Sequence, residues 1–353
     1  MFAGIAWAML GGLFLGTFAL PSKYIKNYAW ENTWGSFFLF AMLVVPVGFA
    51  CLTVNSLWAT FGEVSGGIIF GVLALSFLWG IGFCCWGYGL SMVGLSLGYA
   101  LTMGTMALVG SMLPFFLGSA DKLPTAGGIT VVVGILVCIL GVAVNGFAGM
   151  KREKSQAAGE AEAGGQAKKK IMLAGLLVCV LAGVLSSGLN VAFHVGNGMG
   201  KIAEISKVKF GNAPWQAGLS TWTLVFLGGM ISSVAFSVIM LSKNKTWKGF
   251  GNAASGRNLG LTFLMAVGHF LCIFFYGLGA MKLDSVGEVK LGTSVGFAIF
   301  QSFSVILGSS LGFLTGEWKG ASGKSKGWLV AGLTILVLGI ITVSCGNYVI
   351  STG

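Results

Sequence analysis

Charged residues are scarce in this 353-residue sequence, and their scarcity excludes most classes of protein. Only 9% of the residues are charged and 56% are hydrophobic, against about 25% charged and roughly 45–50% apolar residues in an ordinary soluble domain. Prolines number only five, and the 58 glycines follow no Gly-X-Y period, which excludes collagen-like and disordered chains. The composition therefore predicts a helical membrane protein whose function lies inside the bilayer.

Motifs of ATP-driven transport, metalloenzymes and potassium channels are absent as well. The sequence has no Walker A loop, no His-Glu-x-x-His motif and no Thr-Val-Gly-Tyr-Gly filter. All seven cysteines lie in apolar runs, without a Cys-x-x-Cys pair. We expect no enzymatic activity, no metal and no cofactor. The net charge of +11 does not indicate nucleic acid binding, because the lysines and arginines lie between the apolar runs.

Ten apolar runs have the length that a helix needs to cross a bilayer, about 20 residues. They are residues 2–21, 33–54, 66–90, 95–118, 125–147, 171–194, 215–241, 259–280, 288–313 and 327–350. One polar stretch, residues 150–170, separates the first five runs from the last five. We therefore expect two five-helix units, residues 1–149 and 171–353, joined by this linker.

Lysine and arginine are distributed unequally between the two sets of gaps. Fifteen of the 21 basic residues fall on the side that holds the linker. Because positively charged loops are retained in the cytoplasm, we expect the linker to be cytoplasmic and both termini to lie outside.

The two halves contain similar segments. Residues 88–90 and 276–278 both read Tyr-Gly-Leu, and residues 116–121 parallel residues 313–317, where an acid ends each segment. Since five is an odd number of spans, the two copies would be inverted relative to each other. This is the plan of secondary transporters that work by alternating access, with a substrate site near the bilayer midplane.

Small residues and prolines indicate helix contacts and kinks. Gly12/Gly16 and Gly67/Gly71 have the GxxxG spacing that lets membrane helices pack closely. Pro46 lies within an apolar run, where it is expected to kink the helix.

Two titratable residues at membrane depth are candidates for proton coupling. Glu288 opens the ninth span, whereas the equivalent stretch of the first half, residues 96–101, has no charge. His269 lies midway along the eighth span, and histidine titrates near neutral pH. Ionisable groups inside a membrane are costly and usually functional. The alternatives are a cap paired with Lys282 or Lys290 for Glu288, and a packing role for His269.

Polar and aromatic side chains inside the apolar runs are candidates for ligand binding. They comprise a stripe on the sixth span, two groups on the eighth and ninth spans and one face of the third: Ser186, Asn190 and His194; Tyr276 and Gln301; Trp79, Phe83 and Trp86. Their hydroxyl, amide and imidazole groups can bind a hydroxylated ligand, and aromatic faces can carry a sugar ring. Each can instead serve only helix packing.

The first polar loop carries a distinctive pattern. Residues 21–34 read Pro-Ser-Lys-Tyr-Ile-Lys-Asn-Tyr-Ala-Trp-Glu-Asn-Thr-Trp. This segment resembles the first loop of the L-rhamnose–proton symporter family, a branch of the drug/metabolite transporter superfamily. Further matches are residues 79–82, 88–92, 274–276 and 317–318.

The resemblance implies a ten-span, drug/metabolite transporter-like fold in a bacterial inner membrane. It also implies import of L-rhamnose or a related 6-deoxyhexose together with a proton, and no other cofactor. In this resemblance Glu288 stands where the family has an aspartate, and Lys282 where it has the preceding basic residue, so Lys282 joins the candidate substrate-binding residues.

Two other functions are compatible with the same residues. A drug/metabolite-type carrier or exporter would move a different small solute, because the superfamily fold sets neither cargo nor direction. A non-transporting receptor or scaffold would bind a ligand without accumulating it.

Overall fold

The computed structural model describes residues 1–93, 95–156, 166–285, 290–314, 316 and 318–352. Within these ranges the regular structure is entirely helical. The elements of the first half are α1 (Phe2–Thr17), η1 (Leu20–Tyr24), α2 (Trp30–Leu39), η2 (Phe40–Val44), α3 (Val45–Thr53), α4 (Leu57–Gly62), α5 (Gly66–Val93), α6 (Leu95–Ser119), η3 (Ala120–Lys122) and α7 (Ala126–Gln156). Those of the second half are α8 (Gln166–Ser186), α9 (Gly188–Gly198), α10 (Ile202–Phe210), α11 (Pro214–Lys243), η4 (Trp247–Gly251), α12 (Ser255–Asp284), α13 (Gly292–Leu314) and α14 (Gly323–Thr352).

Ten helical segments of the described chain are long and apolar enough to cross a membrane, which confirms the ten predicted spans. Two of them are interrupted. In the second span the π-helical turn η2 joins α2 to α3, and Pro46 lies in the first turn of α3. In the sixth span the turn residue Ser187 separates α8 from α9. Such interruptions are typical of membrane helices that line a cavity.

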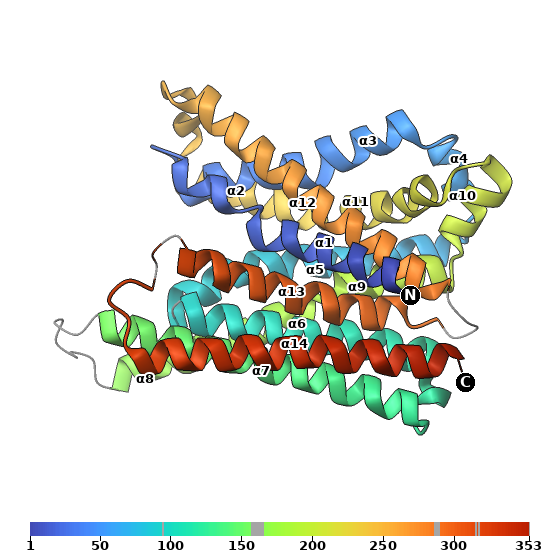
Figure 1. Cartoon of the computed structure of the whole chain (residues 1–353). Coiled ribbons are helices and arrows are strands. Elements are labelled where there is room, and N and C mark those ends of the chain that lie inside the picture. The colour runs from blue at the N-terminus through green and yellow to red at the C-terminus, as the bar shows by residue number, and fades with distance from the viewer. Residues whose placement is uncertain (94, 157–165, 286–289, 315, 317, 353) are drawn as a thin grey trace.

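The two ends of the molecule differ in the segments that they carry. The N-terminus and the end of α14 lie at one end, and the end of α7 and the start of α8 lie at the opposite end (Figure 1). We call the end with the N-terminus the far side, and the end where α7 ends and α8 begins the linker side. Helix α7 continues to Gln156 and α8 begins at Gln166, so helical structure extends into both ends of the polar stretch 150–170.

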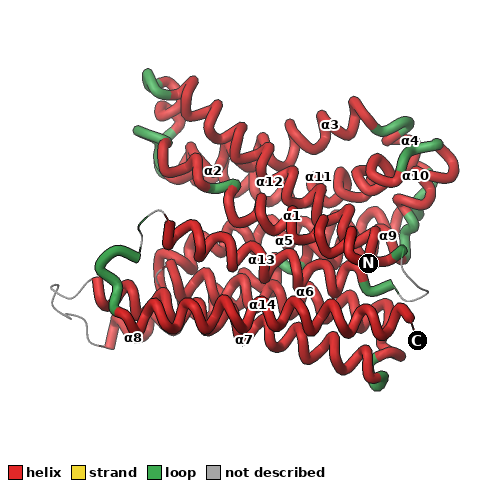
Figure 2. The backbone as a smooth tube through the Cα atoms, viewed as in Figure 1, coloured by secondary structure: helices red, strands yellow, loops and turns green. Residues whose placement is uncertain are grey.

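Helices α7 and α14 form a closely packed antiparallel pair along the lower edge of the bundle (Figure 2). Their contact surface carries glycines at seven-residue intervals: Gly127, Gly134 and Gly141 on α7, and Gly332, Gly339 and Gly346 on α14. A Cβ atom on Gly134 would lie 2.5 Å from the Val343 nitrogen, and one on Gly339 would lie 2.6 Å from the Cys138 sulfur. Only a missing side chain permits this approach of two backbones.

Helix α1 packs against α12 and α13. A Cβ atom on Gly12 would lie 2.7 Å from the Phe300 carbonyl oxygen, and one on Gly16 would lie 2.9 Å from that of Ser304. This confirms the close contact predicted for the pair. The prediction is wrong for Gly67/Gly71, because a Cβ atom at either glycine meets no described atom within 4 Å.

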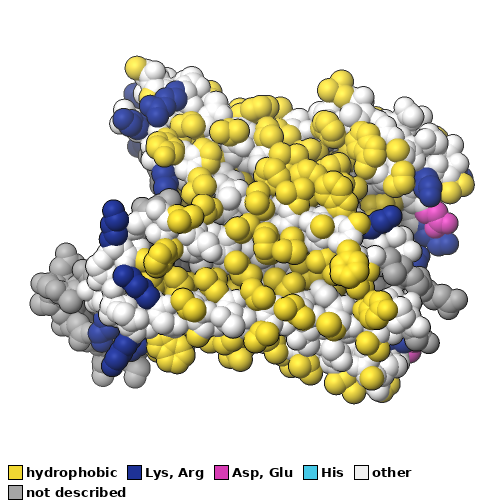
Figure 3. Space-filling model, viewed as in Figure 1, with side chains coloured by type: hydrophobic (Ala, Val, Ile, Leu, Met, Phe, Trp, Pro, Cys, Tyr) yellow, Lys and Arg dark blue, Asp and Glu magenta, His cyan; other side chains and the backbone are white. Residues whose placement is uncertain are grey.

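The surface separates apolar from charged side chains. Hydrophobic side chains cover the middle of the molecule, and lysines and arginines gather at its two ends (Figure 3). The exposed apolar residues are large ones, such as Leu52, which is 87% exposed, and Phe70, which is 74% exposed. This distribution fits a protein whose waist is surrounded by lipid, so the chain is a multi-pass membrane protein.

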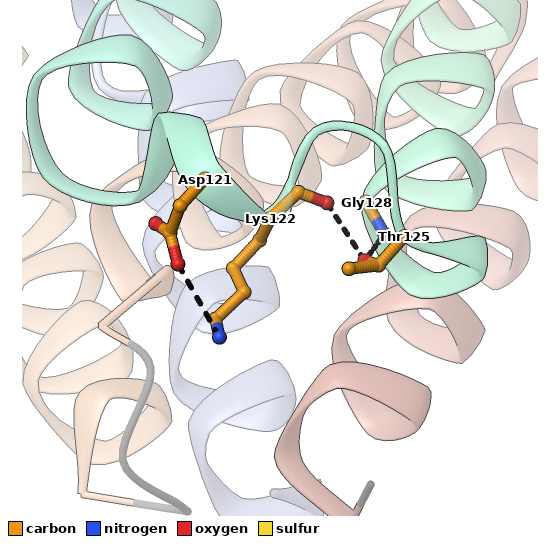
Figure 4. Close-up of polar contacts among 4 residues, drawn as sticks. All are labelled: Asp121, Lys122, Thr125 and Gly128. Carbon is orange, nitrogen blue, oxygen red and sulfur yellow. Dashed lines mark hydrogen bonds and ion pairs between the residues drawn. The ribbon is translucent and has the colours of Figure 1, made fainter.

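The turn between α6 and α7 shows how a span begins on the far side. Thr125 Oγ1 accepts a hydrogen bond from the Gly128 amide at 3.0 Å and donates one to the Lys122 carbonyl oxygen at 2.7 Å (Figure 4). The Thr125 side chain thereby caps α7. Asp121 pairs with Lys122 at 3.3 Å and is largely exposed, so it lies at the helix end where the sequence placed it. Its repeat counterpart, Glu317, lies outside the described residues.

Candidate functional site

One large cavity of about 480 Å³ lies among α1, η1, α5, α6, α7, α8, α9, α12, α13 and α14. At its inner end it is bounded by Leu189, Ile273 and Phe300, at the middle of their spans. At its other end it reaches Lys23 and Arg152 on the linker side, and Lys23 is exposed. The cavity therefore opens toward the linker side. Its volume falls in the range of pockets that hold small organic ligands, about 300–1,000 Å³.

Five of the predicted site residues line this cavity. They come from four helices: Trp79 and Trp86 from α5, Ser186 from the end of α8, His269 from α12, and Gln301 from α13. The fold thus brings together side chains from the third, sixth, eighth and ninth spans.

Gln301 presents an amide without a partner. Its side chain is 1% exposed, and neither Nε2 nor Oε1 has a hydrogen-bond partner among the described residues. Leaving a buried amide unsatisfied costs free energy, on the order of 1–3 kcal/mol. The Gln301 amide has both donor and acceptor atoms, so a ligand hydroxyl or a water molecule in the cavity can form hydrogen bonds with it.

His269 sits within a cage of aromatic rings. Its ring centroid lies 5.4–6.5 Å from those of Phe18, Phe37, Trp79, Phe83 and Phe226, and the imidazole is parallel to the Trp79 indole. The residue is 4% exposed, and Nδ1 has no partner in the described part of the chain. Aromatic rings therefore hold the imidazole in one orientation beside the cavity.

Trp86 and Phe83 form an aromatic wall. Their rings stack at 5.6 Å with an interplanar angle of 12°. The Trp86 Nε1 donor is buried and has no partner among the described residues. A flat aromatic surface beside free donors and acceptors suits a ring that has one apolar face and several hydroxyl groups.

Several polar cavity residues were not among the predicted ones. Asn145 is 8% exposed, and its Oδ1 has no partner within the described chain. The sequence offered one clue to Asn145, because it is an isolated amide residue within the fifth apolar run. Arg152 lies 5.1 Å from the Trp318 ring and 3.9 Å from Glu153. The sequence had placed it in the linker, but it belongs to the last turns of α7. Lys23 and Tyr99 also line the cavity.

Three predicted residues lie behind the cavity rather than in it. Asn190 donates to the carbonyl oxygens of Gly110 and Thr293 and accepts a hydrogen bond from the Tyr276 hydroxyl. His194 Nδ1 and the Thr293 hydroxyl are 2.8 Å apart. The interruption at Ser187 divides the predicted stripe, since Ser186 faces the cavity whereas Asn190 and His194 bind α13.

The remaining two predicted residues are Lys282, in the last turn of α12, and Glu288. Lys282 is exposed and does not line the cavity. Glu288 lies outside the described residues. Beside that segment, an Asp284 carboxylate oxygen accepts a hydrogen bond of 2.6 Å from the Gly292 amide and so ties the end of α12 to the start of α13. In the described ranges no group of three or more His, Cys, Asp or Glu side chains could hold a metal ion.

The fold and the cavity define a class: a multi-span helical membrane protein with a central pocket sized for a small solute. The family model of the L-rhamnose-proton symport protein (RhaT) matches residues 1–349, and the chain belongs to that family, whose members are transporters and not enzymes.

Individual relatives are similar to this chain over almost its whole length. The chain is 26% identical to proteins named "L-rhamnose-proton symporter" from Yersinia pestis (strain Pestoides F) and Yersinia pseudotuberculosis serotype O:3 (strain YPIII), over 97% of each chain. It is 25% identical to the protein of the same name from Salmonella dublin, again over 97% of both chains.

Proposed function

We propose that this chain imports L-rhamnose or a related 6-deoxyhexose together with a proton by alternating access. The observation that carries the proposal is the set of unpartnered polar atoms of Gln301, His269 and Trp86 around one solute-sized cavity, in a chain of the L-rhamnose-proton symport family. The sugar ring rests against Trp86. Its hydroxyl groups bind Gln301 and Ser186, and its methyl group lies among Met103, Met106 and other apolar cavity residues.

The coupling proton binds at Glu288 and His269 in this proposal. Moving one proton down a membrane potential of ~100 mV releases about 2.3 kcal/mol. At about 1.4 kcal/mol per tenfold change, this free energy sustains a sugar gradient on the order of 40–50-fold. A single proton therefore suffices for useful accumulation.

The fold proposed for this mechanism consists of two inverted five-helix repeats, residues 1–149 and 171–353, with residues 150–170 as a cytoplasmic linker in a bacterial inner membrane. The helix contacts support it. The third span packs on the sixth (α5 on α8), and the eighth packs on the first (α12 on α1). Exchanging the two halves converts the first of these pairs into the second, as expected for drug/metabolite transporter-like repeats.

The proposal is tested by uptake into proteoliposomes with an imposed pH gradient. L-rhamnose, a second 6-deoxyhexose and L-mannose, which carries a hydroxyl group where L-rhamnose has none, form the sugar panel. We expect accumulation of the 6-deoxy sugars that depends on the gradient. Gln301→Leu should raise the half-saturation concentration about tenfold or more, because two hydrogen bonds to the sugar are lost.

Asn347→Leu is the matched control. Asn347 is also a buried span amide with an unpartnered nitrogen, but it lies on α14 outside the cavity. Its replacement should leave uptake unchanged. Gradient-driven uptake of an unrelated solute in place of all the sugars would indicate a different carrier or exporter. Saturable sugar binding without accumulation would indicate a receptor.

A further inference from the structure

A hydrogen-bonded cluster joins four helices directly behind the inner end of the cavity. At its centre is Asn190 of α9, which is fully buried. Its Nδ2 lies 2.6 Å from the Gly110 carbonyl oxygen of α6 and 2.9 Å from the Thr293 carbonyl oxygen of α13, and its Oδ1 accepts the hydroxyl proton of Tyr276 on α12. We call Asn190, Tyr276 and the carbonyl groups of Gly110 and Thr293 the latch. It uses both polar atoms of the amide.

The latch lies between the cavity and the far side. Phe300 lines the cavity, and the Tyr276 ring stacks on it at 4.8 Å. Asn190 directly follows Leu189, another cavity residue. One helical turn beyond Asn190, toward the far side, His194 binds the Thr293 hydroxyl and is only partly buried. The latch is therefore one layer deeper than the cavity wall.

Packed aromatic side chains fill the same level. Phe193 and Trp222 stack at 3.9 Å, and Phe297 lies 5.5 Å from Tyr276. Each of these side chains is at most 2% exposed, and none of them lines the cavity. This level is buried and closely packed, so the latch hydrogen bonds are shielded from solvent and are stronger than at an exposed site. Together the latch and the rings close the far side while the linker side is open.

We propose that the latch is the far-side gate, and that its opening turns the cavity toward the far side. This inference rests on the proposed transport function, because alternating access requires one closed end to open. The role it gives Asn190 and Tyr276 is to set which side the cavity faces, not to bind sugar. His194 and the Thr293 hydroxyl form a second contact on the same path.

The test measures from which side the cavity can be reached. A cysteine is placed at Ser186, a cavity residue, and a membrane-impermeant maleimide is added to right-side-out or inside-out membrane vesicles. Fragmentation of the peptide that contains position 186 in the mass spectrometer locates the label there, and distinguishes it from a label on Cys179, which lies in the same stretch between Lys170 and Lys201. With the latch intact, we expect position 186 to be labelled mainly from the linker side.

Variants of the latch should shift this preference. Tyr276→Phe removes one hydroxyl group and should raise the rate of far-side labelling about 3- to 10-fold, with a matching fall on the linker side. Asn190→Ala removes three hydrogen bonds and should shift the labelling further toward the far side. Thr293→Val removes only the contact with His194 and should have the smallest effect. Tyr348→Phe, at an exposed tyrosine of α14, is the control.

The inference is overturned if Tyr276→Phe labels like Tyr348→Phe, or if labelling rises equally from both sides, since the latter reports loosened packing and not a gate. If Asn190→Ala fails to fold, Tyr276→Phe carries the test alone. The labelling experiment needs no sugar. If the variants shift the labelling but the protein transports no rhamnose, the gate inference stands and only the proposed cargo is refuted.

Discussion

At the residue scale, His269 combines a titratable ring with surroundings that hold it in place. Five aromatic rings surround it at 5.4–6.5 Å, and its Nδ1 faces no described partner. Most buried polar groups in proteins are hydrogen-bonded. In the proposed function, this unpartnered nitrogen beside the cavity is the atom that exchanges the coupling proton.

His269→Gln should separate coupling from binding. Glutamine fills a similar space but carries no titratable proton, so sugar exchange between equal concentrations should continue while accumulation driven by a pH gradient falls at least tenfold. The ratio of the two rates in proteoliposomes is the measurement, and Glu288→Gln provides the comparison. Accumulation at the wild-type level in His269→Gln would assign coupling to Glu288 alone, whereas equal loss of both rates would indicate damage to the fold.

The residues of the site were predictable in part. Gln301, His269 and Trp86 stand out as polar or amphipathic groups in apolar runs, and the structure places all three at one cavity. Arg152 and Asn145 were missed. The charge of Arg152 made it part of the linker, and only the extension of α7 to Gln156 brings it to the cavity mouth.

At the element scale, the α7–α14 pair depends on glycine. Gly134→Leu would force a side chain into the space held by Val343, where a Cβ atom alone would lie 2.5 Å from the backbone nitrogen. We expect the free energy of unfolding to fall by about 1–3 kcal/mol, measured by thermal denaturation in detergent. Gly71→Leu is the control, because no described atom lies within 4 Å of its Cβ position. A fall of equal size in both variants would contradict the contact.

The polar stripe of the sixth span lies inside the protein, but its members have different surroundings. A continuous sixth helix would place Ser186, Asn190 and His194 on one face. The turn at Ser187 ends α8, so Ser186 contacts the cavity while Asn190 and His194 bind partners on other helices. The sequence of residues 186–188, Ser-Ser-Gly, has low helix propensity. That weakness does not by itself end a membrane helix.

At the scale of the whole molecule, exposed lysines at the two ends report the orientation. On the far side, Lys201 directly precedes α10 and Lys207 lies within it. On the linker side, Lys245 precedes η4 and Lys248 lies within it. If the linker is cytoplasmic, a membrane-impermeant amine reagent should modify the first pair in right-side-out vesicles and the second pair in inside-out vesicles. Peptide mass spectrometry measures each pair, and the reverse pattern would invert the proposed topology.

The sequence by itself determined the class, the number of spans and the family. Apolar run length and loop composition are local properties, and the bilayer converts them directly into helices. Only the tertiary structure decided which polar groups share the cavity and which tie helices together behind it. The two sets cannot be told apart along the chain. A buried amide that binds a neighbouring helix and one that faces the cavity differ only in which atoms the packed helices bring within hydrogen-bond distance.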